Sequence, residues 1–308
     1  MFIISNLIII NCIEMGDTNI NNNTNKGVMY GFKYCIQNGL GADLVRLTGL
    51  LNLCEIRGTV LYFDPNDIWD HVPKNSPDRS WTYYFEPTIP VATSNNLPRI
   101  DMKNYNMTII PETKKHFNKF QYRSDLMKKI YVPKQEFISI VKNHIHQNLP
   151  DLLKNEYGLI HIRRGDKVTG PWRETQIIQI DRYLDELKKW LNNNPQNNTF
   201  NVYIMTDNDD VIKEIHSKQE EHTLLGIKFI WDNTEIRRDG YSYKLYKHGY
   251  SDDEKVNEMI TNMKNLWLME HAKVMIGARS SFLFITGELL NGNPGISLEN
   301  NNRYPTDL

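Results

Sequence analysis

The chain has 308 residues, of which 40% are hydrophobic and 24% are charged, and its formal net charge at pH 7 is −1. This length allows two domains of ordinary size, and the composition is that of a globular protein with enough apolar residues for two cores. A net charge so close to zero argues against a general binder of nucleic acid or of anionic membranes, because the basic surface of such proteins usually dominates their total charge.

Residues 1–26 are predicted to form a disordered, Asn-rich tail. The apolar run at residues 2–10 is too short to span a bilayer, and it lacks the basic region and the small-residue cleavage site of a signal peptide. The chain has 3 cysteines and no CxxC motif, which favours a reducing compartment over a disulfide framework. We therefore expect a cytoplasmic protein without a transmembrane segment, with Met15 as an alternative start of translation.

Residues 27–150 are predicted to form an N-terminal Rossmann-like domain. Apolar, strand-like runs flank a helical repeat of leucines near its start, whereas residues 70–130 show no sustained period. Asn148-Leu149-Pro150 ends the last helix, so the domain boundary is expected there. The predicted elements are a strand at 28–35, a tight turn at 38–41, a helix at 43–53, a strand at 59–63 and a helix at 135–147.

Residues 151–308 are predicted to form a second Rossmann-like domain. Strands and helices alternate regularly here, which implies a parallel sheet covered by helices. Residues 251–254, Ser-Asp-Asp-Glu, are typical of a capping box, and Asp207 is expected to cap the helix after the second strand. The predicted strands are 157–163, 201–206, 227–231 and 273–277, and the predicted helices are 179–193, one from Asn208, one from Ser251, and one from Ser280-Ser281 to Leu290 with a stop at Gly292.

Charged and polar side chains follow each of these four strands at the point where it ends. In chain order they are Arg163-Arg164, Asp207, Asp232-Asn233 and Ser280-Ser281. The carboxyl ends of parallel strands are where α/β proteins bind ligands. Guanidinium groups bind phosphate at two points, a helix start offers free N–H groups to the same anion, and carboxylates accept hydrogen bonds from ribose hydroxyls or a base edge. The pattern therefore predicts a nucleotide-diphosphate site.

Each of these residues also has a simpler explanation. A lone Arg after a strand is more often part of a surface ion pair, and Asp207 or Ser281 can merely cap a helix. The tripeptide Arg164-Gly165-Asp166 spells a sequence that integrins bind, although that function needs an exposed hairpin tip in an extracellular protein. The nucleotide-site hypothesis is favoured because all the candidates fall at one edge of one sheet.

Residues 161–168, His-Ile-Arg-Arg-Gly-Asp-Lys-Val, resemble the H-x-R-R-x-D-K-V motif of the α1,6-fucosyltransferases, which belong to the fucosyltransferase superfamily. Asn38-Gly39-Leu40-Gly41 is similar to the N-G-L-G that opens the first domain of that family. Three more stretches, at residues 202–208, 229–233 and 272–281, resemble in the same order the family's strand ending in T-D-D, its F-I-x-D-N and its A-D-x-x-V-x-x-x-S-S.

The resemblance implies an α/β, GT-B-like fold, in which two Rossmann-like domains have parallel sheets facing a cleft. It also implies an inverting, metal-independent transferase that moves fucose from GDP-fucose to a hydroxyl of a glycan or glycoconjugate. The N-terminal domain would then be the acceptor side, and the C-terminal domain would bind the nucleotide-sugar donor. We expect no further cofactor and no nucleic-acid partner.

The resemblance also assigns roles around the phosphates. Arg163 would hold the β-phosphate and stabilise the leaving GDP, with Arg164 assisting. His161 would help to seat the nucleotide. Ser281, preceded by Ser280, would cap the phosphates at the start of the last helix.

Further residues are assigned to the surroundings of the donor. Asp166 and Lys167 would order the loop and the acceptor side, and Gly39 and Gly41 would lie on the donor side of the first domain. Inversion requires a general base for the acceptor hydroxyl. Glu174, in the loop after the motif, is the candidate for that base, which assumes a short insertion relative to the family.

Some features point away from this family. Asn265 stands where the family has an Asp that contacts the donor base. Asp207-Asn208-Asp209 matches the D-x-D motif that holds a divalent metal in GT-A glycosyltransferases, and this remains an alternative. A non-catalytic sugar-binding protein on a decayed transferase fold is another alternative.

His144 and His146 are not expected to bind a metal, because i,i+2 spacing on a helix points their rings apart.

Overall fold

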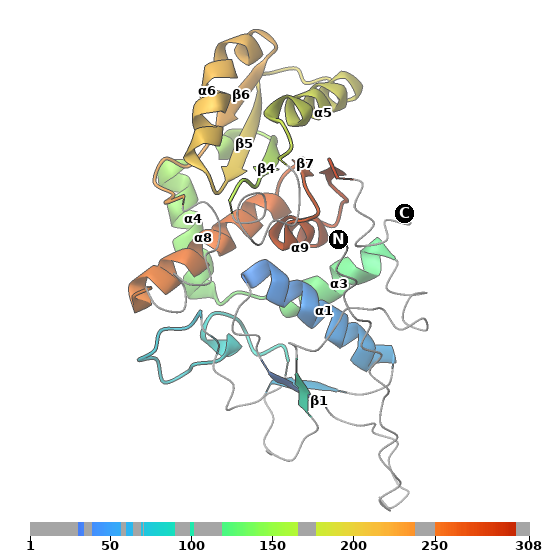
Figure 1. Ribbon diagram of the computed structural model, residues 1–308, viewed down its shortest axis with the longest axis vertical. Coiled ribbons are helices and arrows are strands. Elements are labelled where there is room, and N and C mark those ends of the chain that lie inside the picture. Colours follow the sequence, from blue (N-terminus) through green and yellow to red (C-terminus); the bar gives the residue numbers. More distant parts are fainter. Residues whose placement is uncertain are drawn as a thin grey trace, which may run out of the picture.

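The structure of the protein is a computed structural model that describes residues 30–33, 39–56, 60–63, 69, 71–89, 99–101, 119–165, 177–237 and 250–299. Two parallel β-sheets, one with three strands and one with five, lie within these residues (Figure 1). The predicted tail at residues 1–26 lies outside the described part of the chain.

The N-terminal half contains short strands and three longer helices. In chain order the elements are β1 (Tyr30–Lys33), α1 (Leu40–Ile56), β2 (Leu61–Phe63), the 3-10 turn η1 (Trp81–Tyr83), β3 (Arg99–Asp101), α3 (Phe120–Ile130), α4 (Gln135–Asn148) and the 3-10 turn η2 (Leu152–Lys154). The helix α3 and the strand β3 lie in the stretch where the sequence shows no clear period.

The C-terminal half alternates strands and helices as predicted. Its elements are β4 (Tyr157–Ile162), α5 (Ile180–Asn193), β5 (Phe200–Thr206), α6 (Asp209–Leu224), β6 (Ile227–Ile230), α8 (Asp252–Glu270), β7 (Val274–Gly277), α9 (Phe282–Asn291) and β8 (Ile296–Ser297). The capping box at Ser251 and Glu254 is confirmed, and Gly292 ends α9 in the left-handed conformation that favours glycine.

The larger sheet has the strand order β6-β5-β4-β7-β8, the smaller one has the order β2-β1-β3, and all their strand pairs are parallel. In the larger sheet the chain runs outward from β4 through β5 to β6 and then returns to the other side of β4 as β7. The strand order therefore reverses between β4 and β7. Ligands of open α/β sheets bind outside the carboxyl ends of the strands at such a switch point.

Both faces of the larger sheet are covered, so every residue of its strands β4 and β5 is buried. Alternate residues of β5 point to opposite faces. Val202 and Ile204 pack in a cluster with residues of α5 and α6, whereas Tyr203 and Met205 pack in a second cluster with residues of α8 and α9. Figure 1 shows α5 and α6 beside the larger sheet and α8 and α9 between the two sheets.

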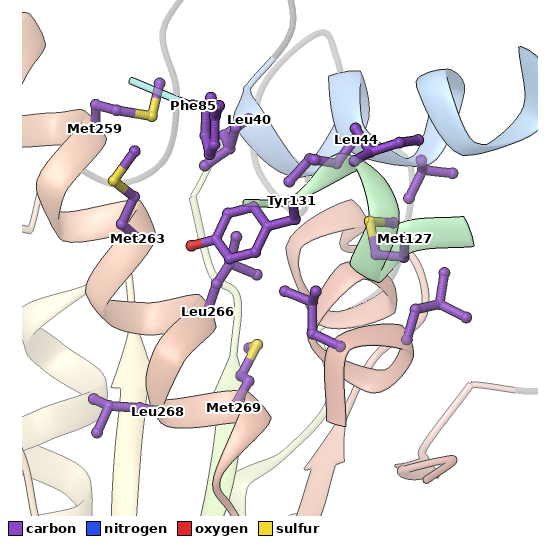
Figure 2. Packing of buried hydrophobic residues seen from close by; sticks show 14 of the residues in the cluster. Leu40, Leu44, Phe85, Met127, Tyr131, Met259, Met263, Leu266, Leu268 and Met269 are labelled. Carbon is purple, nitrogen blue, oxygen red and sulfur yellow. The ribbon is translucent and has the colours of Figure 1, made fainter. Parts of the chain in front are cut away.

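The second cluster joins the two halves of the chain into one core. Figure 2 shows α1, α3 and α8 contributing side chains to it from widely separated parts of the sequence. The labelled members are Leu40, Leu44, Phe85, Met127, Tyr131, Met259, Met263, Leu266, Leu268 and Met269. The division of function at residue 150 stays a prediction, but the helices on either side of it are packed together.

One predicted helix cap is wrong. Asn208, not Asp207, caps α6, since the Asn208 side chain accepts hydrogen bonds from the backbone N–H groups of Asp210 and Val211. Asp207 is instead directed at the neighbouring strand, as described below. Among the helices that the structure describes, none is long and apolar enough to cross a membrane.

Candidate functional site

The candidate site lies at the switch point of the larger sheet, where the predicted polar residues of β4 and β7 come together. The two strands are adjacent, with Ile160 opposite Ile276, and β4 continues beside β5 as far as the pair Ile162–Thr206. The residues after β4, β5 and β7 therefore meet at one sheet edge, as the sequence predicted. This edge adjoins the start of α9.

His161 is a buried polar residue within β4. Its side chain is only 5% exposed, and its ring is stacked on Phe284 of α9 with 6.0 Å between ring centroids. Burial, followed by the positive charge of Arg163, lowers the pKa of His161 to about 3, so the imidazole is neutral at pH 7. Its Nδ1 atom is buried without a hydrogen-bond partner among the described residues.

Arg163 and Arg164 lie on opposite faces of the sheet edge. Arg163 is two residues after His161, so it lies on the face of His161 and α9, and its charge acts on that imidazole. Arg164 lies on the face of α5, where its charge counteracts part of the rise that burial causes in the pKa of Tyr183. The two guanidinium groups therefore approach the site from different sides, and Arg163 is the one beside α9.

The start of α9 supplies a buried hydroxyl group, that of Ser281. Ser281 is the N-cap residue and is 3% exposed, but its side chain accepts no capping hydrogen bond. Its Oγ atom is buried and lacks a hydrogen-bond partner within the described ranges. The preceding Ser280 is also buried, and its backbone N–H donates to Glu299. A helix start with a buried, unpartnered hydroxyl is suited to an anionic oxygen.

The start of α1 meets the start of α9. A Cβ atom added to Gly41 would lie 2.7 Å from the backbone nitrogen of Leu283, so only glycine permits this approach. The Thr286 hydroxyl donates to the carbonyl of Gly41 over 3.1 Å. Gly39, by contrast, faces open space. Two positive helix ends thus converge on one side of the sheet edge.

Asp207 makes contacts that the sequence did not predict. Its Oδ1 atom accepts from the backbone N–H of Arg164 over 2.8 Å, and its Oδ2 atom accepts from that of Gly165 over 3.1 Å. Asp209 is exposed and forms an ion pair with Arg237. The two carboxylates of the D-x-D motif therefore have different partners. In the part of the chain that the structure describes, no group of three His, Cys, Asp or Glu residues could hold a metal ion.

Asp232 lies in a buried network and does not face a ligand. Its side chain is 0% exposed. Its Oδ2 atom accepts from Lys264 over 2.6 Å and contacts His144 over 2.7 Å, and its Oδ1 atom accepts from the N–H and hydroxyl of Thr234. A carboxylate accepts about four hydrogen bonds, and these four contacts occupy all of them. This corrects the expectation that Asp232 accepts from ribose or a base.

Opposite charges hold that network together. Burial alone would raise the pKa of Asp232, but the Lys264 ammonium, with the hydrogen bonds from Lys264, Thr234 and His144, lowers it well below its usual range. Lys264 also pairs with Glu235 over 3.2 Å. Asn265 donates to Glu235, and its Oδ1 atom is buried with no partner among the residues described. No local sequence pattern predicts these roles for His144, Lys264 or Glu235.

Three predicted site residues, Asp166, Lys167 and Glu174, lie outside the described residues. The integrin hypothesis for Arg164-Gly165-Asp166 fits the structure poorly. Arg164 and Gly165 directly follow a central, buried strand, Gly165 is itself buried, and both backbone N–H groups are held by Asp207. An integrin ligand needs these residues at the tip of an exposed hairpin.

Comparisons with known proteins identify the fold. No protein-family model matches the chain, and a search of curated proteins finds no match. A variant of FUT1 from Arabidopsis thaliana in complex with GDP is similar in structure, with a TM-score of 0.52 and 12% identity over 91% of this chain and 72% of that one.

Two further structures give lower scores. NodZ from Bradyrhizobium, a fucosyltransferase, has a TM-score of 0.46 and 10% identity over 87% of this chain and 93% of that one. POFUT1 in complex with GDP has a TM-score of 0.48 and 10% identity over 89% and 97%. The protein has the α/β, GT-B-like architecture that the sequence predicted.

Proposed function

We propose that the protein is an inverting, metal-independent glycosyltransferase that transfers fucose from GDP-fucose to a hydroxyl of a glycan or glycoconjugate. Its fold is similar to that of FUT1, whose structure contains GDP. The motif at residues 161–168 supports the same donor. On this proposal residues 151–308 bind the donor, and residues 27–150 form the acceptor side.

One observation carries the proposal: the buried hydroxyl of Ser281 has no hydrogen-bond partner in the described part of the chain. A buried polar group without a partner costs about 1–3 kcal/mol. This hydroxyl lies at the start of α9, where α1 also begins, and Arg163 is on the same face of the sheet. A phosphate oxygen bound there would satisfy the hydroxyl and meet two positive helix ends.

The same arrangement accounts for the chemistry. Cleavage of the bond between fucose and phosphate leaves negative charge on the departing GDP. The Arg163 guanidinium and the helix ends would stabilise that charge without reorganisation, which lowers the barrier. The neutral His161 offers a hydrogen-bonding Nδ1 atom beside them. Glu174 is proposed as the base that takes the proton of the acceptor hydroxyl, while Asp166 and Lys167 order the loop before it.

The metal-dependent alternative has less support. It requires Asp207 and Asp209 to share a cation, but Asp207 directs both oxygens at backbone N–H groups and Asp209 pairs with Arg237. A sugar-binding protein on a decayed transferase fold would need neither Arg163 at this sheet edge nor the buried hydroxyl of Ser281, which is unpartnered among the described residues. The transferase hypothesis explains both features.

A thermal-shift comparison of nucleotides tests the proposal. We expect GDP to raise the melting temperature more than UDP, CMP or ADP at the same concentration. A ligand present at 100 times its dissociation constant adds about 2.7 kcal/mol of stability. Inorganic phosphate serves as the control for a nonspecific anion effect. A larger shift with UDP would point to a different donor, and no shift with any nucleotide would contradict the proposal.

A further inference from the structure

Asp207 connects the ends of β4 and β5 after their backbone pairing has stopped. The last residues paired in that ladder are Ile162 and Thr206. Beyond them the two carboxylate oxygens of Asp207 bind two consecutive backbone N–H groups, those of Arg164 and Gly165, at 2.8 and 3.1 Å. The side chain thus continues the connection between the strands where the backbones no longer supply it.

This contact fixes the direction in which the chain leaves the sheet at Arg163. Two hydrogen bonds from successive peptide units to one rigid carboxylate restrict the rotation of both units. Hydrogen bonds to an ionised acceptor are roughly twice as strong as those between neutral groups. Arg163 lies between the last ladder pair and the first of these N–H groups, so its backbone is held on both sides.

Asp207 is not needed as a helix cap, and its contacts are not those of a metal ligand. The α6 helix is capped by Asn208, so the Asp207 carboxylate is not needed there. Both of its oxygens accept hydrogen bonds from backbone N–H groups at the end of β4. The neighbouring carboxylate Asp209 points to Arg237, which leaves no shared metal position. The contacts of Asp207 are those of a group that holds a loop.

We infer that Asp207 is a positioning residue: it holds the turn at residues 163–165 so that Arg163 meets the diphosphate, and it does not itself contact the nucleotide or a metal. The inference rests on the proposed function, because it assigns to Arg163 the contact with the leaving group. It replaces the expectation that Asp207 accepts hydrogen bonds from the donor.

A double-mutant cycle tests this inference. Asp207→Asn keeps the shape of the side chain, but its NH2 group cannot accept from a backbone N–H. We expect it to lower kcat for GDP release from GDP-fucose by about 10- to 100-fold. KM should change much less, because Arg163 stabilises charge that develops during the reaction. In an Arg163→Ala background the same change should alter the rate by no more than about twofold.

The matched control is Asp210→Asn, since Asp210 is an exposed carboxylate in the first turn of α6, three residues after Asp207, and pairs with Lys213. It should leave kcat and KM unchanged. Multiplicative losses in the double mutant, or a rise in KM for GDP-fucose with kcat preserved, would overturn the inference, because either result means that Asp207 contacts the donor independently of Arg163.

Hydrogen exchange separates a failure of this inference from a failure of the proposed function. The backbone N–H groups of Arg164 and Gly165 should exchange at least about tenfold faster in Asp207→Asn than in the wild type, and at the wild-type rate in Asp210→Asn. Unchanged exchange in Asp207→Asn overturns the positioning role whatever the enzyme does. A wild-type protein that releases no GDP, with faster exchange in Asp207→Asn, would count against the proposed donor chemistry and leave the turn contact supported.

Discussion

Arg163→Ala should lower the rate of GDP release from GDP-fucose by about 10²–10³, and Arg163→Lys should be nearly as slow. Removing one preorganised transition-state donor costs about 3–4 kcal/mol. Lysine keeps the charge, but its ammonium cannot reproduce the planar two-point contact of guanidinium with phosphate. The steady-state rate of each purified variant, measured at saturating GDP-fucose, gives the comparison.

Arg164→Ala is the matched comparison for this prediction. Arg164 lies on the α5 face of the sheet edge, near Tyr183, so its loss should cost less activity than the loss of Arg163. Melting temperatures of all three variants should stay near that of the wild type, because both residues follow the end of β4 and lie outside the apolar clusters. Near-normal activity in a folded Arg163→Ala protein would contradict the role of Arg163 in stabilising the leaving GDP.

Lys264→Ala should destabilise the protein by about 3–5 kcal/mol, because it leaves the Asp232 carboxylate buried without its ammonium partner. The Lys264 and Asp232 side chains are 3% and 0% exposed. Urea denaturation of the variant and the wild type measures the difference. Lys189→Ala is the control, since Lys189 pairs with Glu186 at the exposed surface and its loss should change stability much less. Equal effects of the two substitutions would show that the buried network contributes little.

The same network predicts how that difference depends on pH. The pKa of Asp232 is lower in the folded protein than in the unfolded chain, so its contribution to stability is present above the ordinary pKa of aspartate and is lost as the pH falls below it. Without Lys264 the carboxyl group should take up a proton more easily. The stability difference between Lys264→Ala and the wild type should therefore shrink in acid.

The grouping of polar residues at the edge of the larger sheet could be predicted from the sequence, because the pattern that marks each of them is local. Each strand of the C-terminal half is an apolar run that ends in a polar residue, and parallel pairing brings such ends together whatever the order of the strands. This pattern predicts that Arg163 and Ser281 meet at one edge, whereas His161 is assigned by the family resemblance. The strand order itself, with β7 beside β4, comes from packing and not from any short motif.

The roles of the carboxylates could not be predicted, because their partners are distant in sequence. Asp232 contacts His144, which is 88 positions away, and Asp207 contacts Arg164, 43 positions away. An aspartate after a strand looks the same in the sequence whether it faces a ligand, caps a helix or holds a neighbouring turn. Only the geometry separates these possibilities, and here it assigns Asp207 and Asp232 to internal contacts.

The region at residues 70–130 was hard to interpret for a different reason. Its described part is held by aromatic packing and not by a repeating pattern: Trp81 of η1 stacks on Phe85 with 4.1 Å between ring centroids, and Trp69 donates to Asp43 of α1 over 2.9 Å. Such contacts depend on the folded chain and leave no period in the sequence. The helix α3 is also short, so its apolar face spans few turns.

We expect this sheet edge to cleave GDP-fucose by means of Arg163 and the helix ends, without a metal. The most direct measurement is the rate of GDP release when the wild-type protein is incubated with GDP-fucose in excess EDTA, with and without a glycan acceptor. We predict that GDP is released at the rate seen without EDTA and that Mn²⁺ brings no increase. Release that EDTA abolishes and Mn²⁺ restores would contradict the claim and favour a metal held by Asp207 and Asp209.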